Sequence, residues 1–353
     1  MATYDLLAGL PIEVERYELE GLAREVSTGF ERQTTLIRMH GAGEEGIGED
    51  VVYDGVDHDA LQAAGPVHDL TGPRTLGELC TLTEELDLFP TREPERGEVS
   101  RLYRRWAFHS AALDLALRQA GRPLHEVLGR DPAPVTFVVS LRLGEPASME
   151  PLRKRLDPYP SLRFKLDPTA DWDEHLIAEL VATGAVDSVD FKAFYKGTVV
   201  DQTAGPELYR AVAEAFPDAW IEDPGIEDPE VDAVLRPHRD RITWDAPIHS
   251  IEDIEALPFP PKMVNIKPSR FGPLRSLCAG YDYCAEHGIR AYGGGQFELG
   301  VGRGQAQYLA SLFHPDTPND IAPGGYNDPD PPPGLPSSPL PPTPARTGFR
   351  WEG

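Results

Sequence analysis

Short runs rich in β-forming residues alternate with amphipathic stretches from about residue 134 onward, and no other feature constrains the fold as strongly. Helical candidates between the runs include residues 174–183, 206–215 and 274–287. Strands that alternate with helices pair in parallel, so the pattern predicts an α/β fold. Seven or eight such units favour a closed β/α barrel over an open sheet. The runs begin at Val135, Leu162, Val189, Ala219, Ile242, Met263 and Ile289, with residues 295–298 as a candidate eighth.

The two ends of the chain do not follow this alternating pattern. Residues 11–56 contain alternating β-rich runs, and the apolar stripe of residues 99–120 predicts a helix that ends at Gly121. The 353 residues exceed the about 250 of one barrel, so an additional domain is expected. After residue 323 the chain is rich in proline, which excludes helix and central strand and leaves a disordered extension or an extended arm. The late apolar residues Phe349 and Trp351 favour an anchored end.

Composition excludes several classes of partner. Acidic residues outnumber basic ones 58 to 33, which gives a net charge of −25. Such a surface repels nucleic-acid phosphates and anionic membranes, so an anionic substrate would need local positive charge to enter. Cys80, Cys278 and Cys284 show no metal or redox spacing, and no apolar run approaches the ~20 residues of a bilayer span. We therefore expect a cytoplasmic protein without a nucleic-acid or membrane partner.

Charged residues recur at the ends of the predicted strands. From Lys165 to Lys267, five such residues follow one another at intervals of 25, 32, 23 and 22 residues, and each interval is about one β/α unit. A single Asp or Lys at such a place is usually a solvated loop charge or a helix cap. The carboxyl ends of barrel strands meet at one mouth, however, so all six are expected around one cavity. The six are Lys165, Asp190, Glu222, Asp245, Lys267 and Glu298.

The residue types in this set indicate a metal-dependent acid–base site. Asp190, Glu222 and Asp245 offer the hard oxygen ligands that Mg²⁺ prefers, with Mn²⁺ as the alternative. Lys165 and Lys267 would flank the ion, and a desolvated lysine near other cations can act as a base. The metal would stabilise the enediolate that forms when a carboxylate loses its α-proton.

The sequence resembles the enolase superfamily, most closely its muconate-lactonizing subgroup, over nearly the whole chain. The segment Trp-Ile-Glu-Asp-Pro at 220–224 looks like the fourth barrel strand of the family, and Val-Asn-Ile-Lys-Pro-Ser-Arg at 264–270 looks like the sixth. Residues 111–129 resemble the helix that leads from the capping domain into the barrel, and residues 293–302 resemble the seventh and eighth strand ends.

The resemblance implies an architecture and a set of roles. It implies an α+β capping domain at 1–130, a modified (β/α) barrel at 131–322, and a Pro-rich tail at 323–353 that returns to the capping domain. Lys165 and Lys267 would be the catalytic lysines, and Asp190, Glu222 and Asp245 would bind the metal. Family members are often oligomers, so a homo-oligomer is an expectation. The candidate substrate contacts are Arg163, Lys192, Asn265, Glu298, Arg32 and Tyr53.

Three positions depart from the pattern of the family. Lys192 stands where the third strand of the family has Asn, Ala246 replaces a carboxylate after Asp245, and Asp167 replaces a glycine. Because strand side chains alternate, Lys192 is expected on the same side as Asp190, where it would weaken metal binding or replace part of its charge. The alternative is that Lys192 leans toward solvent.

The implied function is removal of the α-proton of a small carboxylate substrate by an isomerase or a carbon–oxygen lyase. Racemisation or epimerisation, β-elimination and cycloisomerisation all fit two lysines and a metal. Dipeptide epimerases of the family carry Asp-x-Asp in the eighth strand region, and Gln296-Phe-Glu298 does not match it. The alternative is a catalytically silent relative that binds an anionic ligand or serves as an assembly subunit.

Overall fold

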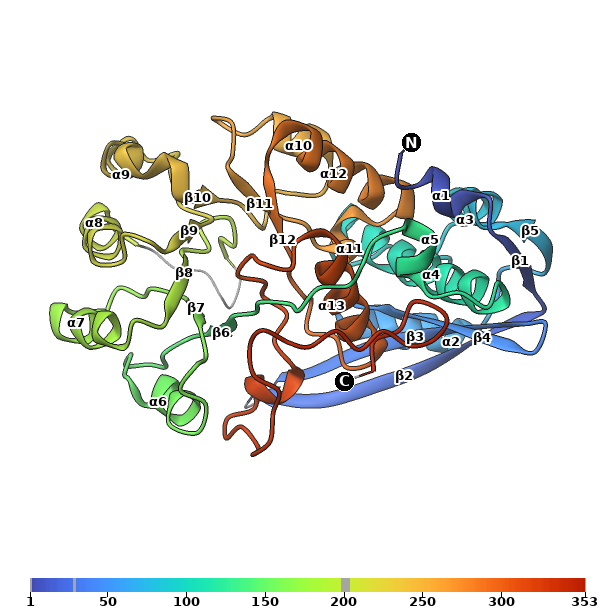
Figure 1. Ribbon diagram of the computed structural model, residues 1–353, viewed down its shortest axis with the longest axis horizontal. Coiled ribbons are helices and arrows are strands. Elements are labelled where there is room, and N and C mark those ends of the chain that lie inside the picture. The colour runs from blue at the N-terminus through green and yellow to red at the C-terminus, as the bar shows by residue number, and fades with distance from the viewer. Residues whose placement is uncertain (1, 28–29, 198–203, 353) are drawn as a thin grey trace.

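The computed structural model describes residues 2–27, 30–197 and 204–352 and shows two lobes (Figure 1). One lobe is a barrel whose first five strands form a parallel sheet in the order β10-β9-β8-β7-β6. A parallel pair, β11 and β12, continues the wall. The barrel strands are β6 (Val139–Leu141), β7 (Phe164–Leu166), β8 (Val186–Asp190), β9 (Trp220–Glu222), β10 (Ile242–Thr243), β11 (Met263–Asn265) and β12 (Arg290–Tyr292).

Two short bridges close the barrel. Gly294, just after β12, pairs in parallel with Asp320, and the neighbouring Asn319 pairs in parallel with Phe137, just before β6. Asn319 and Asp320 therefore occupy the eighth strand position. The prediction that residues 295–298 form this strand is wrong, because this segment is a loop without strand pairing. Glu298 accordingly lies on a loop and does not end a strand.

Helices follow the barrel strands and cover the outside of the barrel (Figure 1). Their boundaries have local causes: Asp173 and Asp228 accept hydrogen bonds from the first-turn amides of α7 and α9, and Gly184 ends α7 in a left-handed conformation. The helices are α6 (Glu150–Leu156), α7 (Glu174–Thr183), α8 (Pro206–Ala215), α9 (Pro229–Leu235), η1 (Arg236–Arg241), α10 (Ile251–Glu255), α11 (Pro268–Phe271), α12 (Leu274–His287), α13 (Val301–Phe313) and η2 (Gly324–Asn327).

The other lobe packs an antiparallel sheet of order β2-β3-β4 against the long helix α4 (Glu98–Gln119). Gly46 and Gly48 allow this close approach, since a Cβ at Gly48 would lie 2.0 Å from the Ala107 carbonyl oxygen. The remaining elements are α1 (Asp5–Ala8), β1 (Pro11–Val14), β2 (Arg16–Ser27), β3 (Phe30–Gly41), β4 (Glu44–Asp50), α2 (Gly55–Ala64), β5 (Gly72–Thr75), α3 (Leu76–Glu85) and α5 (Leu124–Leu128). β1 pairs antiparallel with β5.

The Pro-rich end of the chain is packed on the fold. Leu340 pairs with Val135, and Gly348 pairs with Pro123. The Phe349 amide donates to the Asp114 carboxylate in α4 at 2.8 Å, and the Phe349 ring is fully buried. These contacts place Leu340 beside the segment that enters the barrel, and residues 348–349 against α4 and the start of α5.

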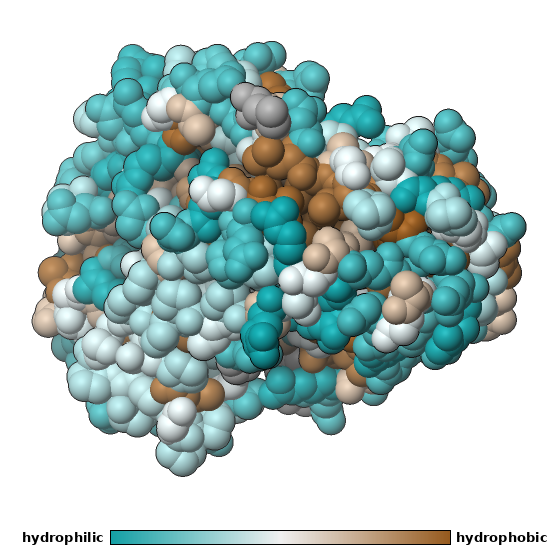
Figure 2. Space-filling model, turned by 45° about the vertical axis from the view of Figure 1, so that its right-hand side comes forward, coloured by the Kyte–Doolittle hydropathy of each residue, from teal (hydrophilic) through white to brown (hydrophobic). Residues whose placement is uncertain are grey.

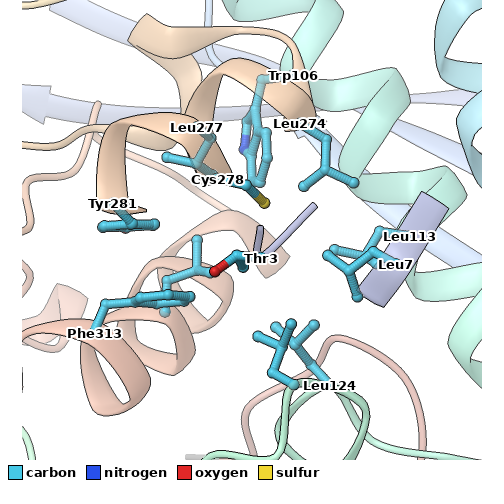
Figure 3. A pocket seen from close by; sticks show the side chains of 12 residues that line it. Thr3, Leu7, Trp106, Leu113, Leu124, Leu274, Leu277, Cys278, Tyr281 and Phe313 are labelled. Atoms are coloured by element: carbon cyan, nitrogen blue, oxygen red, sulfur yellow. The ribbon is translucent and has the colours of Figure 1, made fainter. Parts of the chain in front are cut away.

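Apolar side chains fill the contact between α1, α4, α12 and α13. They leave a cavity of about 10 Å³, lined by residues such as Trp106, Leu274 and Phe313 (Figure 3). This volume is at the lower limit for a single water molecule, so the cavity cannot hold a substrate. The outer surface shown in Figure 2 is predominantly hydrophilic, with hydrophobic residues gathered near the middle of that face. Among the described residues, no helix is both long and apolar enough to cross a membrane.

Candidate active site

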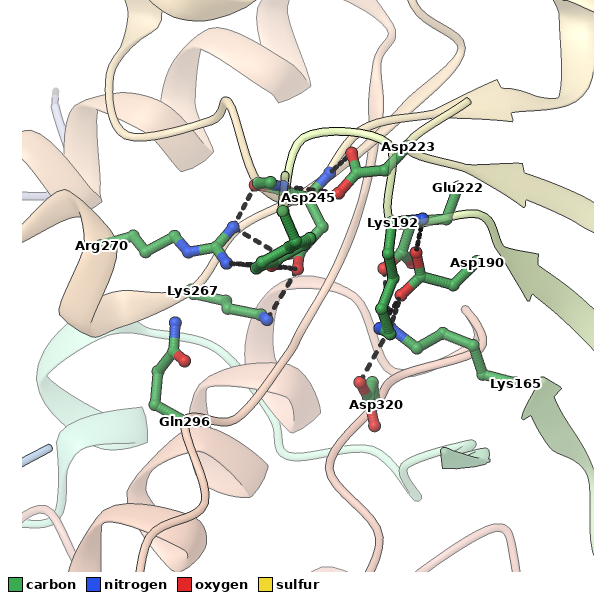
Figure 4. Close-up of polar contacts among 12 residues, drawn as sticks. Lys165, Asp190, Lys192, Glu222, Asp223, Asp245, Lys267, Arg270, Gln296 and Asp320 are labelled. Atoms are coloured by element: carbon green, nitrogen blue, oxygen red, sulfur yellow. Dashed lines mark hydrogen bonds and ion pairs between the residues drawn. The ribbon is translucent and has the colours of Figure 1, made fainter. Parts of the chain in front are cut away.

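Lys165 lies at the centre of a buried group of carboxylates at the carboxyl ends of the barrel strands (Figure 4). Its Nζ lies 2.6 Å from Glu222 Oε1, 3.0 Å from Asp320 Oδ2 and 3.3 Å from Asp190 Oδ2. Strand register explains the arrangement, because Asp190 pairs directly with Glu222 across β8 and β9. Burial opposes the charge on Lys165, but Asp320, Glu222 and Asp190 outweigh it and raise its pKa well above the usual value.

Lys192 points into the same group. Its Nζ lies 2.6 Å from Asp190 Oδ2 and 3.5 Å from Asp167 Oδ1. The expectation that Lys192 faces the same side as Asp190 agrees with these distances, and the alternative that it leans toward solvent does not. Burial raises the pKa of Asp190 less than the ammonium groups of Lys192 and Lys165 lower it, so that pKa falls to about 2.

A second group of charges lies around Asp245, after β10. Asp245 Oδ2 lies 2.9 Å from Lys267 Nζ, and Asp245 Oδ1 lies 2.9 Å from the Arg270 guanidinium. Arg270 also donates to the Tyr195 hydroxyl at 2.9 Å. Burial, Arg270 and Lys165 lower the pKa of Lys267, although Asp245 opposes the shift. The surroundings thus lower the pKa of Lys267 and raise the pKa of Lys165.

Among the described residues, the acidic group best placed to share one metal ion differs from the predicted set. Asp190, Glu222 and Asp223 each offer an oxygen, and these atoms lie within 4.8 Å of one another. Asp245 is not in this group, and its carboxylate pairs with Lys267 and Arg270. The prediction of Asp190 and Glu222 as neighbours agrees with the structure, whereas the third member is Asp223 in place of Asp245.

Asp223 is held by backbone geometry. It adopts a left-handed conformation with φ of 47°, and its two oxygens accept from the amides of Asp245 and Ala246 at 2.9 Å each. Burial and the nearby Asp245 and Asp190 raise the pKa of Asp223 to about 7. Its position directly after Glu222 was the only sequence signal for it, and an Asp-Pro turn explains that signal equally well.

The charges around the mouth do not balance. Among the residues that the structure describes, six carboxylates face four cations there, which leaves two negative charges if all are ionised. One divalent ion or two protons would compensate, and the pKa of Asp167 is raised by burial to about 6 while Lys192 opposes the shift. All-oxygen donors, mutual distances below 4.8 Å and this excess of negative charge fit a hard divalent cation. We call the following ten residues the mouth cluster: Asp167, Asp190, Glu222, Asp223, Asp245, Asp320, Lys165, Lys192, Lys267 and Arg270.

Sequence reasoning missed two further polar residues at this site. Asp320 bonds Lys165 from the eighth strand position, and Tyr292 at the end of β12 donates from its hydroxyl to Glu222 Oε2 at 2.5 Å. Sequence patterns could not reveal Asp320, because only Asn319 and Asp320 pair in the short strand that closes the barrel. Tyr292 could have been found, since it ends a predicted strand.

Asn265, predicted as a substrate contact, is 1% exposed at the end of β11, and both polar atoms of its side chain lack a protein partner. It lies beside Lys267, because a Cβ at Gly294 would meet both side chains within 3 Å. A buried amide without a partner is costly. Asn265 therefore offers its amide NH₂ group as a donor and its amide oxygen as an acceptor to a bound molecule.

Arg163 does not reach the mouth. Its guanidinium bonds the Asp187 carboxylate and the Gly184 carbonyl oxygen, where β8 begins. Although Arg163 shares the side of Lys165 by alternation, it lies before the first residue of β7, at the opposite end of the barrel. The structure therefore contradicts the prediction that Arg163 contacts substrate.

Arg32 and Tyr53 form a junction between the two lobes. Arg32 is fully buried and donates to the carbonyl oxygens of Val51, Val52, Gln296 and Phe297 at 2.5–3.2 Å. The Tyr53 hydroxyl donates to Gln296 Oε1 at 3.0 Å. Each hydrogen bond of Arg32 that the structure describes thus goes to a backbone carbonyl oxygen, which corrects its predicted role as a substrate contact.

Glu298 and Glu49 complete this junction. Glu298 Oε1 accepts from the Gln296 amide at 2.6 Å, and Oε2 lies 3.1 Å from the Arg303 guanidinium. Glu49, at the end of β4, accepts from the amides of Leu299, Gly300 and Gly302 at 2.7–3.1 Å, at the start of α13. A carboxylate is stabilising at a helix N-terminus. Glu298 therefore shapes the loop that follows β12, and Glu49 was not among the predicted residues.

Known structures share this architecture. A member of the enolase superfamily from Listeria innocua Clip11262 superposes with a TM-score of 0.62 at 20% identity, over 89% of this chain and 86% of that one. A dipeptide epimerase from Methylococcus capsulatus, complexed with Mg ion, gives a TM-score of 0.61 at 21% identity, over 87% and 89%. Muconate lactonizing enzyme gives 0.61 at 17%, over 88% of each chain. At these identities the likeness shows the fold, a modified β/α barrel with a capping domain.

Sequence similarity extends the comparison to relatives of known activity. An o-succinylbenzoate synthase of Bacillus subtilis (strain 168) is 30% identical over 227 residues, 60% of this chain and 57% of the relative. An N-succinylamino acid racemase of Amycolatopsis sp is 41% identical over 61 residues, 17% of each. The chain spans less than two thirds of the length of these relatives.

Two family models cover the chain: "Domain of unknown function (DUF8230) N-terminal domain" at residues 5–127, and the corresponding C-terminal domain at residues 131–328. The fold and the relatives above are similar to those of the enolase superfamily. The chain itself belongs to the DUF8230 family.

Proposed function

We propose that the protein removes the α-proton of a small carboxylate substrate and stabilises the resulting enediolate at the mouth of the barrel. One observation carries the proposal: two buried lysines, Lys165 on the second barrel strand and Lys267 after the sixth, reach the mouth from opposite walls. In a ring of eight strands, the second and sixth face each other. A substrate carbon held between them would have one amine on each face.

The two lysines would divide the proton transfer. One takes the α-proton from one face of the carbon, and the other delivers a proton to the opposite face, which inverts the centre. If the β-carbon carries a leaving group, loss of that group gives elimination, and the second lysine then acts as a cation near the enolate. The relatives include an o-succinylbenzoate synthase and an N-succinylamino acid racemase, so both outcomes belong to the proposal.

A divalent ion completes the proposed site. Asp190, Glu222 and Asp223 would hold Mg²⁺ or Mn²⁺, with Asp245 as the further candidate from the sequence. Bound there, the ion would supply positive charge for the substrate carboxylate and for the developing enediolate. The chain itself contributes the buried Asn265 amide, which would orient a polar group of the substrate beside Lys267. The three cysteines are free and buried, which supports the proposed cytoplasmic location.

A specific observation favours a second candidate, a silent protein that binds an anionic ligand. Each oxygen of the three proposed metal ligands already accepts from a protein donor: Lys192 on Asp190, Lys165 and Tyr292 on Glu222, and backbone amides on Asp223. In such a site the protein donors would satisfy the carboxylates without a metal ion, and the protein would not turn over a substrate. Both lysines would then serve only to balance charge.

Proton exchange in D₂O separates the two candidates. N-acyl amino acids, acid sugars, dipeptides and lactones would be incubated with the protein and followed by NMR, with and without Mg²⁺. The proposal predicts metal-dependent deuterium incorporation at an α-carbon, and the compound that exchanges identifies the substrate class. Calorimetric binding of a carboxylate without exchange of its α-proton would support the silent candidate instead.

A further inference from the structure

Lys192 places an ammonium group inside the proposed metal site. Its Nζ lies 2.6 Å from Asp190 Oδ2, and its side chain is only 15% exposed. The same carboxylate oxygen lies 3.3 Å from Lys165 Nζ. One proposed metal ligand is therefore already shared between two cations, and a third cation would have to compete for it.

The backbone holds Lys192 in this position. Its φ of 51° is left-handed, which is uncommon for a residue other than glycine, asparagine or aspartate. In this conformation the Lys192 amide donates to Asp190 Oδ1 at 3.0 Å while its ammonium group bonds Oδ2. The lysine thus engages both oxygens of one carboxylate, and the amide contact does not depend on where the side chain points.

Asp167 offers the ammonium group a second partner. Asp167 Oδ1 is buried without a hydrogen-bond partner and lies 3.5 Å from Lys192 Nζ. The register of β7 and β8 pairs Lys165 with Ser188, so Asp167 comes level with Asp190 two residues further on. An unpartnered buried carboxylate oxygen is costly. A small rotation of the Lys192 side chain would satisfy it.

From this arrangement we propose that Lys192 is a tethered cation that competes with the divalent ion for Asp190 and moves to Asp167 when the ion binds. The inference rests on the metal site of the proposed function and adds to it a built-in control of metal affinity. Without metal, the ammonium group satisfies Asp190. With metal, Asp167 accepts the displaced ammonium group, while the Lys192 amide stays on Asp190.

The test measures metal binding directly. Mg²⁺ would be titrated calorimetrically into the wild-type chain and into Lys192→Asn, with the Mg²⁺-induced rise in Tm as a second readout. Asparagine tolerates the left-handed backbone and keeps the amide contact, so this variant is expected to fold. We expect its dissociation constant for Mg²⁺ to fall about tenfold or more, equivalent to about 1.4 kcal/mol.

Asp167 supplies the second arm of the experiment. With Lys192 present, Asp167→Asn removes the alternative partner of the ammonium group, so Mg²⁺ binding should weaken about threefold or more. In the Lys192→Asn background the same change should alter affinity by less than about twofold, because Asp167 acts through Lys192. If Asp167→Asn weakens binding equally in both backgrounds, Asp167 acts directly on the metal and the exchange between two carboxylates is refuted.

The matched control is Lys196→Asn, four residues further along the chain, where the side chain is 79% exposed beside Glu227. It removes the same charge and should leave Mg²⁺ affinity unchanged within about twofold. Equal affinities in the wild type and Lys192→Asn would overturn this inference while leaving the metal site intact. No Mg²⁺ binding by any variant would overturn both this inference and the metal site of the proposed function.

Discussion

Two buried polar regions of this molecule, the mouth cluster and the junction between the lobes, differ in how their groups are satisfied. At the junction, Arg32 and Glu49 bond to backbone carbonyl and amide groups. In the mouth cluster, most charged side chains bond to each other, although Asp223 accepts from backbone amides. Asn265 beside the cluster and Asp167 within it keep atoms without partners. Backbone partners fix a structure, whereas exchangeable side-chain partners and unfilled atoms leave room for a ligand. Changes in the mouth cluster should therefore alter chemistry, and changes at the junction should alter stability.

The largest effect is expected from the two lysines. Lys165→Ala and Lys267→Ala should each lower α-proton exchange about 10³-fold for the enantiomer whose α-proton faces the missing lysine, because each removes one acid–base group. With a racemised substrate, each variant should still exchange the proton that faces the remaining lysine. Following deuterium incorporation into each enantiomer by NMR measures this directly. Equal loss for both enantiomers in both variants would show that the lysines do not serve opposite faces.

The next effect is expected at the junction and should appear in stability. Arg32→Ala leaves several buried carbonyl oxygens without their donor, so the free energy of unfolding should fall by about 3 kcal/mol. Urea unfolding measures the loss, and Arg96→Ala, at a side chain that is 51% exposed, should change it by less than about 0.5 kcal/mol. Mg²⁺ affinity of the folded Arg32→Ala chain should stay near the wild-type value. A large loss of affinity with unchanged stability would restore Arg32 as a ligand contact.

The smallest effect concerns His109, a buried residue of α4 that links α3 and the start of α12. Its Nδ1 accepts from the Leu274 amide at 3.0 Å and its Nε2 lies 2.8 Å from the Thr83 hydroxyl, so the buried ring is neutral. Burial, with nearby Arg105, lowers the pKa of His109 to about 3. The unfolded chain binds this proton near pH 6.5 and the folded chain only near 3, so stability is lost as the pH falls between these values.

At pH 5.5 the contribution of His109 to this loss is about 1 kcal/mol relative to neutral pH. His109→Gln removes the titrating group, so its unfolding free energy should depend less steeply on pH between 7.5 and 5.5. Urea unfolding at several pH values measures the two slopes. Parallel slopes for the variant and the wild type would show that His109 is not buried in its neutral form.

The sequence predicted the barrel and most of the mouth because strand-end positions follow from periodicity alone. Lys165, Asp190, Glu222 and Lys267 were found this way, and all four reach the mouth. Asp245 was also found this way and reaches the mouth, where it pairs with Lys267 and Arg270. The sequence did not single out Asp223, because its left-handed backbone depends on tertiary contacts. Arg163, which the resemblance implied as a substrate contact, does not reach the mouth because it lies before β7, at the opposite end of the barrel.

The capping-domain residues were harder to predict for a related reason. Arg32 and Tyr53 were placed near the mouth by their position in expected loops, but which groups they bond depends on how the two lobes dock. Glu49 carried no local signal, since its partners at residues 299–302 are far away in the sequence. Closure of the barrel at Asp320 escaped detection because a two-residue strand has no periodicity.

The most direct test of the central claim is the exchange of one α-proton in D₂O. An N-succinyl amino acid would be incubated with the wild-type chain and Mg²⁺, and the Cα proton signal would be followed by NMR beside Lys165→Ala and Lys267→Ala. For a single enantiomer, the proposed function predicts loss of that signal with the wild type and Mg²⁺, and much slower loss with the variant that lacks the lysine facing that proton. Wild-type exchange that persists unchanged in both variants would contradict it, because the two lysines could not then be the groups that move the proton.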